Sequence, residues 1–289
     1  MRLFVLILLA FFAAAPVAAQ VPFRSDRILV ETRGQGPDVV LIPGLASTAA
    51  VWRRTADRLD DHYRVHLVTV RGFGPTDPGG NANGAVSAPV ANEIRRYIAQ
   101  AGLERPALIG HSLGGQIALR VAAADGPRVG RVMVVDAAPF FPSLISESAR
   151  SQDVEPIAQI AYSALRLLGD DALRNRGAGL GADLGGASDA LFGTLGWQGG
   201  DRRVLAQGLY EVMTADLRGR LRDITAPITV VYGWSADSGN PRAQVDALFR
   251  AGYRGVRTPA RFERIEGAEH MVMVDQPARF QAAVDRFLD

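Results

Sequence analysis

The residues Ala107-Leu108-Ile109-Gly110-His111-Ser112-Leu113-Gly114-Gly115 fix the architecture of this chain. A short apolar run leads into the segment, and an apolar helical pattern from Leu113 to Ala124 follows it. Between them lies Gly-x-Ser-x-Gly, a pattern in which a sharp strand-to-helix turn holds a serine above a sheet edge. Glycines 110 and 114 let the flanking backbones pass closely, and the helix amino terminus directs free N–H groups at an oxyanion. The segment predicts a nucleophilic serine, Ser112.

Similar short apolar runs recur on both sides of this turn and alternate with helical patterns. Continuous apolar runs are typical of strands that are buried on both faces of a parallel sheet. The predicted strands are Arg27–Thr32, Val39–Ile42, Val65–Val70, Ala107–Ile109, Val132–Val135, Ile228–Tyr232 and Phe262–Ile265. The predicted helices are Thr48–Leu59, Ala88–Ala101, Leu113–Ala124, Pro241–Ala251 and Pro277–Leu288. The alternation predicts an α/β fold with a doubly wound, mostly parallel sheet and right-handed crossovers.

One stretch breaks this alternation, from Ala138 to about Arg222, where no strand pattern occurs. Apolar residues at helical spacing lie between Val154 and Leu168 and again between Val204 and Met213, and the intervening residues 169–200 are rich in glycine. We interpret residues 138–222 as an inserted helical cap. Residues 20–137 and 223–289 then form the core. The alternative is a disordered linker between two domains.

The amino terminus has the composition of a targeting segment. Arg2 precedes an apolar run from Leu3 to Ala15, and small residues follow as far as Ala19. This order is typical of a secretory signal peptide of residues 1–19, cleaved after Ala19. The run is shorter than the ~20 residues of a full membrane span. We expect an exported protein, periplasmic or secreted, with an uncleaved membrane anchor as the alternative.

Composition excludes several kinds of chemistry. The 289 residues include no cysteine and no lysine, so thiol catalysis, cysteine-zinc sites, disulfides and Schiff-base chemistry are absent. The 32 basic and 30 acidic residues leave a net charge of +2, which gives no strong field for nucleic acid. The expected partner is a small molecule, and the sequence does not indicate an oligomeric state.

A serine hydroxyl needs a base, and the chain holds four histidines. His111 adjoins Ser112 in the turn, where its side chain is expected to point away from the serine. His62 and His66 flank a strand and have no third ligand nearby, so we interpret them as structural and predict no metal site. His270 follows the last predicted strand, where ligand chemistry collects in open α/β sheets. We therefore predict that His270 is the general base.

The third member of such a site is a carboxylate that orients the imidazole. Asp237 lies just past the Ile228–Tyr232 strand and gives the chain order serine, aspartate, histidine. Asp136 is the alternative, at the end of the strand that follows the nucleophile. Asp237 is the preferred prediction.

Two backbone N–H groups are needed to stabilise an oxyanion. The amide of Leu113, directly after the nucleophile, is one candidate. The second is expected in the loop Pro43-Gly44-Leu45-Ala46, where Gly44 allows close approach of the backbone and the Leu45 amide is the candidate donor.

Together these motifs resemble the α/β-hydrolase superfamily, of the kind with a helical cap, over nearly all of the chain except the cap. The resemblance rests on Leu41-Ile42-Pro43-Gly44-Leu45 with Trp52, Arg71-Gly72-Phe73-Gly74, Gly110-His111-Ser112-Leu113-Gly114-Gly115, Tyr232-Gly233 with Asp237, and Gly267-Ala268-Glu269-His270 before Pro277 and the final Phe287-Leu288. Two departures occur: many relatives have His-Gly in place of Pro43-Gly44, and their acid commonly lies three residues past the strand-end glycine, whereas Asp237 lies four past Gly233.

The resemblance implies a serine hydrolase that needs no cofactor. A serine nucleophile argues against the dehalogenases and epoxide hydrolases of this superfamily, which use aspartate. We expect hydrolysis of carboxylic esters with an apolar acyl or aryl group. The alternatives are C–C bond hydrolysis, peracid formation, or ligand binding on the same fold.

Apolar residues of the predicted cap are candidates for the substrate pocket. They are Phe140, Phe141, Leu191, Phe192, Leu195 and Trp197. Trp234, near the predicted acid, is a further candidate.

Overall fold

The computed structural model describes residues 22–176 and 196–289, except for the side chains of residues 170–176. A seven-stranded sheet runs through the centre in the order β1-β3-β2-β4-β5-β6-β7. The strands are β1 (Ile28–Arg33), β2 (Asp38–Ile42), β3 (Arg64–Val70), β4 (Ala107–His111), β5 (Arg131–Val135), β6 (Ile228–Trp234) and β7 (Arg261–Glu266). Only the pairing of β1 with β3 is antiparallel among these strands. The predicted mostly parallel α/β sheet is confirmed.

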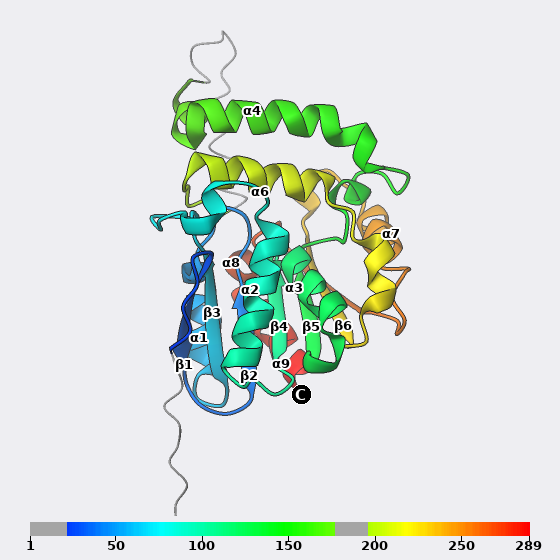
Figure 1. Cartoon of the computed structure of the whole chain (residues 1–289). Helices are drawn as coiled ribbons and strands as arrows, with labels where there is room; N and C mark the ends of the chain where they lie inside the picture. The colour runs from blue at the N-terminus through cyan, green and yellow to red at the C-terminus, as the bar shows by residue number, and fades with distance from the viewer. Residues whose placement is uncertain (1–21, 177–195) are drawn as a thin grey trace, which may run out of the picture.

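Helices cover both faces of this sheet, with α2 and α3 in front and α1 and α9 behind in the view of Figure 1. The bounds are α1 (Arg53–Leu59), α2 (Ser87–Gln100), α3 (Leu113–Ala124), α7 (Arg242–Gly252), α8 (Val272–Asp275) and α9 (Pro277–Leu288). A 3-10 turn, Ala49–Trp52, precedes α1. Each predicted core helix is therefore present, and the short α8 was not predicted.

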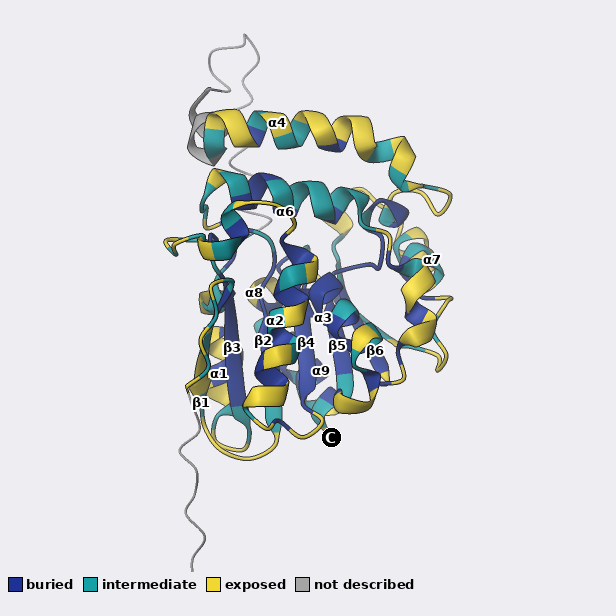
Figure 2. Cartoon of the chain, viewed as in Figure 1, coloured by how far each residue is buried: buried dark blue, intermediate teal, exposed yellow. Residues whose placement is uncertain are grey.

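The five inner strands, β3, β2, β4, β5 and β6, are mostly buried on both faces, so two separate cores form. In β2, Val40 and Ile42 face the cluster under α2 and α3, while Val39 and Leu41 face the cluster under α1 and α9. This follows from the two-residue period of a strand. Figure 2 shows these strands as an almost continuous buried layer. Burial on both sides fixes the height at which each strand ends, and so positions the loops that follow.

The chain between β5 and β6 is helical where it is described. The helices are η4 (Phe141–Leu144), α4 (Ser151–Arg176), α6 (Arg202–Thr214) and η6 (Arg218–Asp223). Helix α6 lies across the carboxyl edge of the sheet, and α4 packs on its outer side (Figure 1). Glu211 of α6 accepts hydrogen bonds from the backbone N–H groups of Val86 and Ser87 at the start of α2, at 2.8 and 2.7 Å. These bonds tie α6 to the core.

Helix α4 buries only part of its apolar surface. Ala158 and Leu165 are buried, whereas Ile157, Ile160 and Leu167 are 62%, 71% and 74% exposed. The apolar pattern that predicted this helix therefore includes a solvent-facing side as well as the side against α6.

The remaining predictions concern the amino terminus and membrane-spanning segments. The predicted signal peptide, residues 1–19, lies outside the described residues. Within the described part, no helix is long and apolar enough to cross a membrane.

Candidate active site

Ser112 stands at the turn between β4 and α3. Its backbone has φ 51° and ψ −121°, a conformation that L-residues avoid and that costs on the order of 1–3 kcal/mol. The Ser112 N–H donates to the carbonyl of Val135 at 2.9 Å, which holds the turn against β5. A Cβ on Gly110 would lie 2.2 Å from the carbonyl oxygen of Gly114, and one on Gly114 would lie 2.3 Å from that of Ile42. Both glycines are therefore needed for the strained turn that presents Ser112.

The backbone around Ser112 offers hydrogen-bond donors. Leu113 is the first residue of α3, so its N–H has no acceptor within the helix and lies at the positive end of the helix dipole. The loop after β2 packs closely from the other side, because a Cβ on Gly44 would lie 3.1 Å from the Ser112 Cβ. Leu45 follows Gly44 in this loop. The contribution of the Leu45 amide to an oxyanion hole stays a prediction.

His270 follows β7 in a loop that reaches the Ser112 turn. Its ring centroid lies 4.6 Å from that of His111, the residue before Ser112. His270 Nδ1 hydrogen-bonds to Asp136 Oδ2 at 2.7 Å. Because a carboxylate only accepts, the hydrogen is on Nδ1 and the lone pair is on Nε2. Nε2 makes no hydrogen bond with a described residue, so it is free to accept the proton of a neighbouring hydroxyl.

Asp136 is held from two sides at the end of β5. Its backbone N–H donates to the carbonyl of Val231 at 2.8 Å, and its φ of 45° turns the residue out of the strand. Oδ1 accepts a hydrogen bond from the Gly233 N–H at 3.1 Å while Oδ2 bonds to His270. Both carboxylate oxygens thus have partners, which fixes the orientation of the imidazole.

The geometry contradicts the preferred prediction for the acid. Asp237 lies in an exposed 3-10 turn, Ala236–Ser238, and its carboxylate makes no hydrogen bond or ion pair within the described part of the chain. Strand β6 continues two residues beyond the predicted end, to Trp234, and the exposed turn that holds Asp237 follows it. Asp136, the alternative, is the residue beside His270.

His111 holds the loop that carries His270. Its Nε2 lies 2.9 Å from the carbonyl oxygen of His270 and donates to it. Nδ1 of His111 is buried without a hydrogen-bond partner among the described residues. Burial, together with the nearby His270, lowers the pKa of His111 well below its usual value, so the ring is neutral. A Cβ on Gly44 would lie 2.8 Å from Nδ1, so only glycine fits there.

Apolar side chains surround Ser112 and His270. Gly208 of α6 lies over the side chains of Leu45, Phe73 and Leu113: a Cβ on it would be 2.7 Å from Leu45 and 3.8 Å from Leu113. Phe141 approaches His270 edge-on, with the ring centroids 6.2 Å apart. Helix α6 therefore roofs the site through a residue without a side chain.

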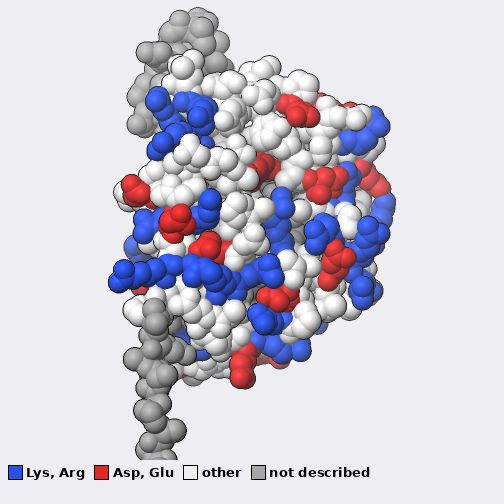
Figure 3. Space-filling view, viewed as in Figure 1, with Lys and Arg blue, Asp and Glu red and all other residues white. Residues whose placement is uncertain are grey.

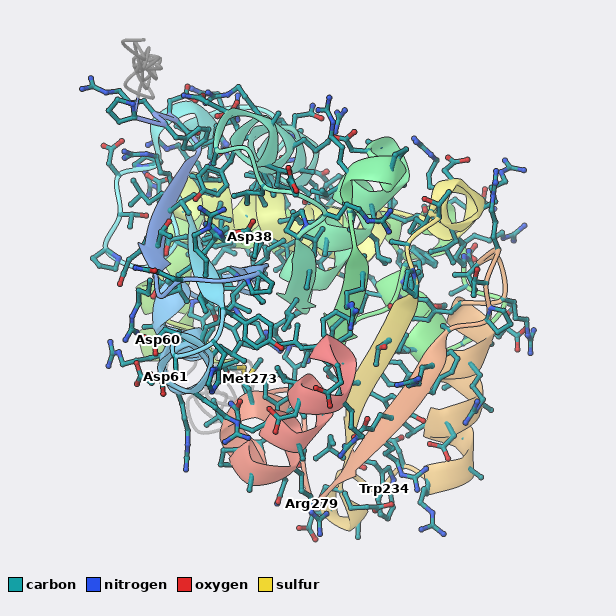
Figure 4. All side chains as sticks on the ribbon, turned by 90° about the horizontal axis from the view of Figure 1, so that it is seen from below. Asp38, Asp60, Asp61, Trp234, Met273 and Arg279 are labelled. Atoms are coloured by element: carbon teal, nitrogen blue, oxygen red, sulfur yellow. The ribbon has the colours of Figure 1, made fainter. Side chains whose placement is uncertain are left out.

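The other predicted pocket residues lie in different settings. Phe140 is buried under the guanidinium of Arg218, 4.7 Å from the ring centroid. Trp234 is half-buried, and its indole N–H donates to the carbonyl of Asn240 at 2.9 Å. Trp197 lines a cleft of about 740 Å³ with Met273 and Glu269. Figure 4 shows Trp234 well apart from Met273. Leu191, Phe192 and Leu195 lie outside the described residues.

The histidines interpreted as structural are not gathered into a metal centre. His66 is buried and bonds to Asp38 and to Tyr97. Within the described ranges, no group of three or more histidine, aspartate or glutamate side chains could hold a metal ion.

Sequence reasoning missed the role of His111 and the contact at Gly208. Phe73 lies in the motif Arg71-Gly72-Phe73-Gly74, but its position beside Gly208 was not predicted. The signal for Asp136 was present, since β5 follows the nucleophile strand directly. No pattern marked Gly208, which lies in an ordinary amphipathic helix.

Comparison with known proteins agrees with this fold. Residues 39–283 match the model of the alpha/beta hydrolase family. A pimeloyl-[acyl-carrier protein] methyl ester esterase of Aliivibrio salmonicida is 30% identical over 209 residues, covering 70% of this chain and 76% of the relative. Among solved structures, an esterase from Exiguobacterium antarcticum aligns with a TM-score of 0.68 at 21% identity, covering 90% and 95% of the two chains. The enol-lactonase of Burkholderia xenovorans aligns with a TM-score of 0.66 at 20% identity, over 90% and 96%.

Proposed function

The chain belongs to the alpha/beta hydrolase family, and on this basis we propose that it hydrolyses carboxylic esters through an acyl-enzyme on Ser112. The observation that carries the proposal is the 2.7 Å bond between His270 Nδ1 and Asp136, beside the strained Ser112 turn. That bond leaves Nε2 of His270 as the base. A serine, an oriented imidazole and a helix amino terminus are the parts that acyl transfer requires.

The first half of the reaction forms the acyl-enzyme. Ser112 Oγ attacks the ester carbonyl while His270 Nε2 takes its proton, and Asp136 stabilises the resulting imidazolium. The tetrahedral oxyanion accepts hydrogen bonds from the Leu113 amide and, we propose, from the Leu45 amide, each donor stabilising it by about 3 kcal/mol. The C–O bond to the alcohol then breaks, and the proton on Nε2 passes to the leaving oxygen.

The second half of the reaction hydrolyses the acyl-enzyme and regenerates the free enzyme. Water takes the place of the alcohol, gives a proton to His270 Nε2 and attacks the acyl carbon. A second tetrahedral oxyanion forms between the same amides. When it collapses, the bond from the acyl carbon to Ser112 Oγ breaks, the proton returns to Oγ, and a carboxylic acid is released.

We propose an apolar acyl or aryl group as the substrate, with residues 138–222 acting as a cap that selects it. Leu45, Phe73 and Leu113 lie below Gly208, and Phe141 lies against His270, so these side chains form an apolar wall at the site. An apolar wall favours an uncharged acyl chain over a charged one. The methyl ester named for the Aliivibrio relative makes small alkyl esters the first substrates to test.

The test compares the chain from residue 20 onward with its Ser112→Ala variant on short p-nitrophenyl and methyl esters. The parent is expected to show a burst of alcohol release, followed by turnover, and the variant neither. Labelling of Ser112 by a fluorophosphonate provides an independent readout. Equal rates for the two proteins would refute the assignment.

We also propose that the protein is exported. The support is the run from Leu3 to Ala15 between Arg2 and the small residues that end at Ala19. Expression of the full chain in a bacterium with two membranes, followed by fractionation and amino-terminal sequencing, is expected to yield periplasmic protein that begins at Gln20. A chain that keeps residues 1–19 and sediments with membranes would favour the anchored alternative.

A further inference from the structure

A second cavity lies away from the active site, on the face of the molecule formed by α2 and α3. It encloses about 150 Å³ between these helices and the 3-10 helix η6. Its apolar lining residues include Ala91, Leu119, Ala123, Leu217, Leu221 and Ile224. The polar lining residues are Asn92, Arg120 and Arg220, and no acidic residue is among those described as lining it. Figure 3 shows basic side chains on this face.

Arg120 is the unusual member of this lining. It projects from α3 into the cavity wall, and its Nε is buried without a hydrogen-bond partner. The other two guanidinium nitrogens make no hydrogen bond or ion pair with a described residue, and unlike Nε they are not fully buried. Burial lowers the pKa of Arg120, since the charged form loses hydration. Arg120 is half-buried, and a buried N–H such as its Nε–H is costly without an acceptor, because the five donors of a guanidinium normally have acceptors.

The nearby carboxylates are committed to other groups. Glu211 interacts with Arg120 only through long-range charge attraction, since its two carboxylate oxygens accept hydrogen bonds from the Val86 and Ser87 amides. Asp223 pairs with Arg220 at 2.6 Å, on the more exposed side of the cavity. Asp125, at the end of α3, lies 3.6 Å from Arg95. Arg120 therefore keeps its donors for an external anion.

We propose that this cavity binds a small organic carboxylate, with the carboxylate on Arg120 and the apolar part between Leu119, Leu221 and Ile224. The cavity volume of about 150 Å³ suits a single ring, since a cavity of roughly that size lined by apolar side chains takes up benzene. A guanidinium matches a carboxylate with two parallel hydrogen bonds. Aliphatic walls favour an anion with an apolar body over inorganic phosphate. This site is separate from Ser112 and does not depend on the proposed esterase activity.

The experiment measures binding of 4-fluorobenzoate by fluorine NMR to the protein from residue 20 onward. Because the active site could also take a carboxylate, the same titration is run on the Ser112→Ala variant and on protein blocked at Ser112 by a phosphonate. Binding that persists in both is expected. Hexanoate is expected to compete, whereas inorganic phosphate at equal concentration is not.

Two variants locate the site. Arg120→Met keeps the apolar stem and removes the donors, and is expected to weaken binding at least tenfold while ester hydrolysis is unchanged. Arg254→Met, an exposed arginine paired with Glu147 on the surface, is the matched control and is expected to bind as the parent does. Arg120→Lys is expected to bind with intermediate affinity, because lysine restores the charge but cannot form the two parallel hydrogen bonds of a guanidinium.

The proposal is overturned if 4-fluorobenzoate does not bind, if Arg120→Met binds as tightly as the parent, or if phosphonate at Ser112 abolishes binding. Phosphate that competes as well as hexanoate would show a simple anion site and would refute the carboxylate assignment. A circular dichroism spectrum and melting curve of Arg120→Met check that the fold is intact. If that variant does not fold, Leu221→Trp, which fills the cavity from η6, replaces it and is expected to abolish binding.

Discussion

Two aspartate–histidine pairs with similar N···O distances occur among the described residues of this molecule. Asp136 meets His270 at 2.7 Å at the carboxyl edge of the sheet, and Asp38 meets His66 at 2.9 Å between β2 and β3. The side chains of the first pair are 15% and 12% exposed, and those of the second are 7% and 2% exposed. The same two residue types thus serve a site that must admit a substrate and a site that is sealed.

The two pairs differ in the partner of the second ring nitrogen. In the Asp38–His66 pair, the inner pair, Nε2 of His66 binds Asp38 and Nδ1 lies 2.7 Å from the Tyr97 hydroxyl, so both nitrogens are occupied. In the Asp136–His270 pair, the outer pair, Nδ1 of His270 binds Asp136, and Nε2 has no hydrogen-bond partner among the described residues. A histidine whose lone pair is occupied within the core cannot serve as a base for a ligand. The free nitrogen, and not the aspartate–histidine contact, marks the reactive pair.

The largest expected effect separates the two histidines. His270→Gln removes the base and is expected to lower kcat/KM by on the order of 10⁴- to 10⁶-fold without unfolding the protein. His66→Gln is expected to keep the turnover per folded molecule and to lower the melting temperature. Ester hydrolysis and thermal unfolding, measured on both variants, check this. Loss of turnover in folded His66→Gln would remove the distinction drawn between the pairs.

The next effect identifies the carboxylate. Asp136→Asn is expected to lower kcat by about 10⁴-fold, because an amide in that place can donate to Nδ1 and stabilise the wrong tautomer of His270. Asp237→Asn is the matched control, since Asp237 is exposed and its carboxylate has no partner in the described structure. Steady-state kinetics of the two variants decide the matter. If the Asp237 variant were the inactive one, the acid would have to be reassigned.

The inner pair is expected to show its effect in stability. Asp38 accepts hydrogen bonds from both His66 and Arg64, and its side chain is 7% exposed. Asp38→Ala removes the acceptor from both and is expected to lower the free energy of unfolding by about 3 kcal/mol. Asp237→Ala is expected to change it by less than about 0.5 kcal/mol. Urea unfolding measures both, and a loss below about 1 kcal/mol at Asp38 would show that water replaces the carboxylate easily.

The pH dependence of stability follows from two buried histidines. Burial, opposed by Asp38, lowers the pKa of His66, and burial together with His270 lowers that of His111. Near pH 6.5 these histidines therefore become protonated in the unfolded chain but stay neutral in the folded chain. The free energy of unfolding therefore decreases as the pH falls below about 6.5, by up to ~1.4 kcal/mol per pH unit for each group. Urea unfolding between pH 7.5 and 5 checks this, and His66→Gln is expected to reduce the slope. An equal slope in parent and variant would contradict it.

Asp38 contributes in a lower pH range. Burial raises its pKa, but hydrogen bonds from Arg64 and His66 outweigh burial, and the pKa falls below 3.8. Its stabilisation is therefore present above the unfolded pKa and is lost only as the pH falls through the folded value.

The centre of the sheet could be predicted because its inner strands are buried on both faces and contain unbroken apolar runs, as in Val39–Ile42 and Val132–Val135. Ser112 could be predicted because its turn needs two glycines at fixed spacing. His270 followed from the position of its loop after the last strand. These features depend on local sequence, so they can be read without knowing which strands are neighbours.

The acid could not be decided in this way. Asp136 and Asp237 both follow a strand, and both give the order serine, aspartate, histidine along the chain. The choice depends on the positive φ of Asp136 and on the Gly233 amide that binds its carboxylate, both of which require the assembled edge of β5 and β6. The extension of β6 to Trp234 has the same origin, because its last residues pair with β7.

The smallest expected effect concerns His111, which contacts His270 through the backbone. His111→Leu removes the 2.9 Å hydrogen bond to the His270 carbonyl, and the looser loop is expected to lower kcat about 5- to 10-fold, since a single neutral hydrogen bond contributes about 1 kcal/mol. His111→Gln can supply a donor at a similar distance along the side chain and is expected to restore most of this loss. A merely structural role would lower the amount of folded enzyme in both variants alike, so active-site titration with a fluorophosphonate is needed to express kcat per competent Ser112. Full kcat in His111→Leu would show that Asp136 alone positions His270, and the two aspartate–histidine pairs would then differ only in the free nitrogen.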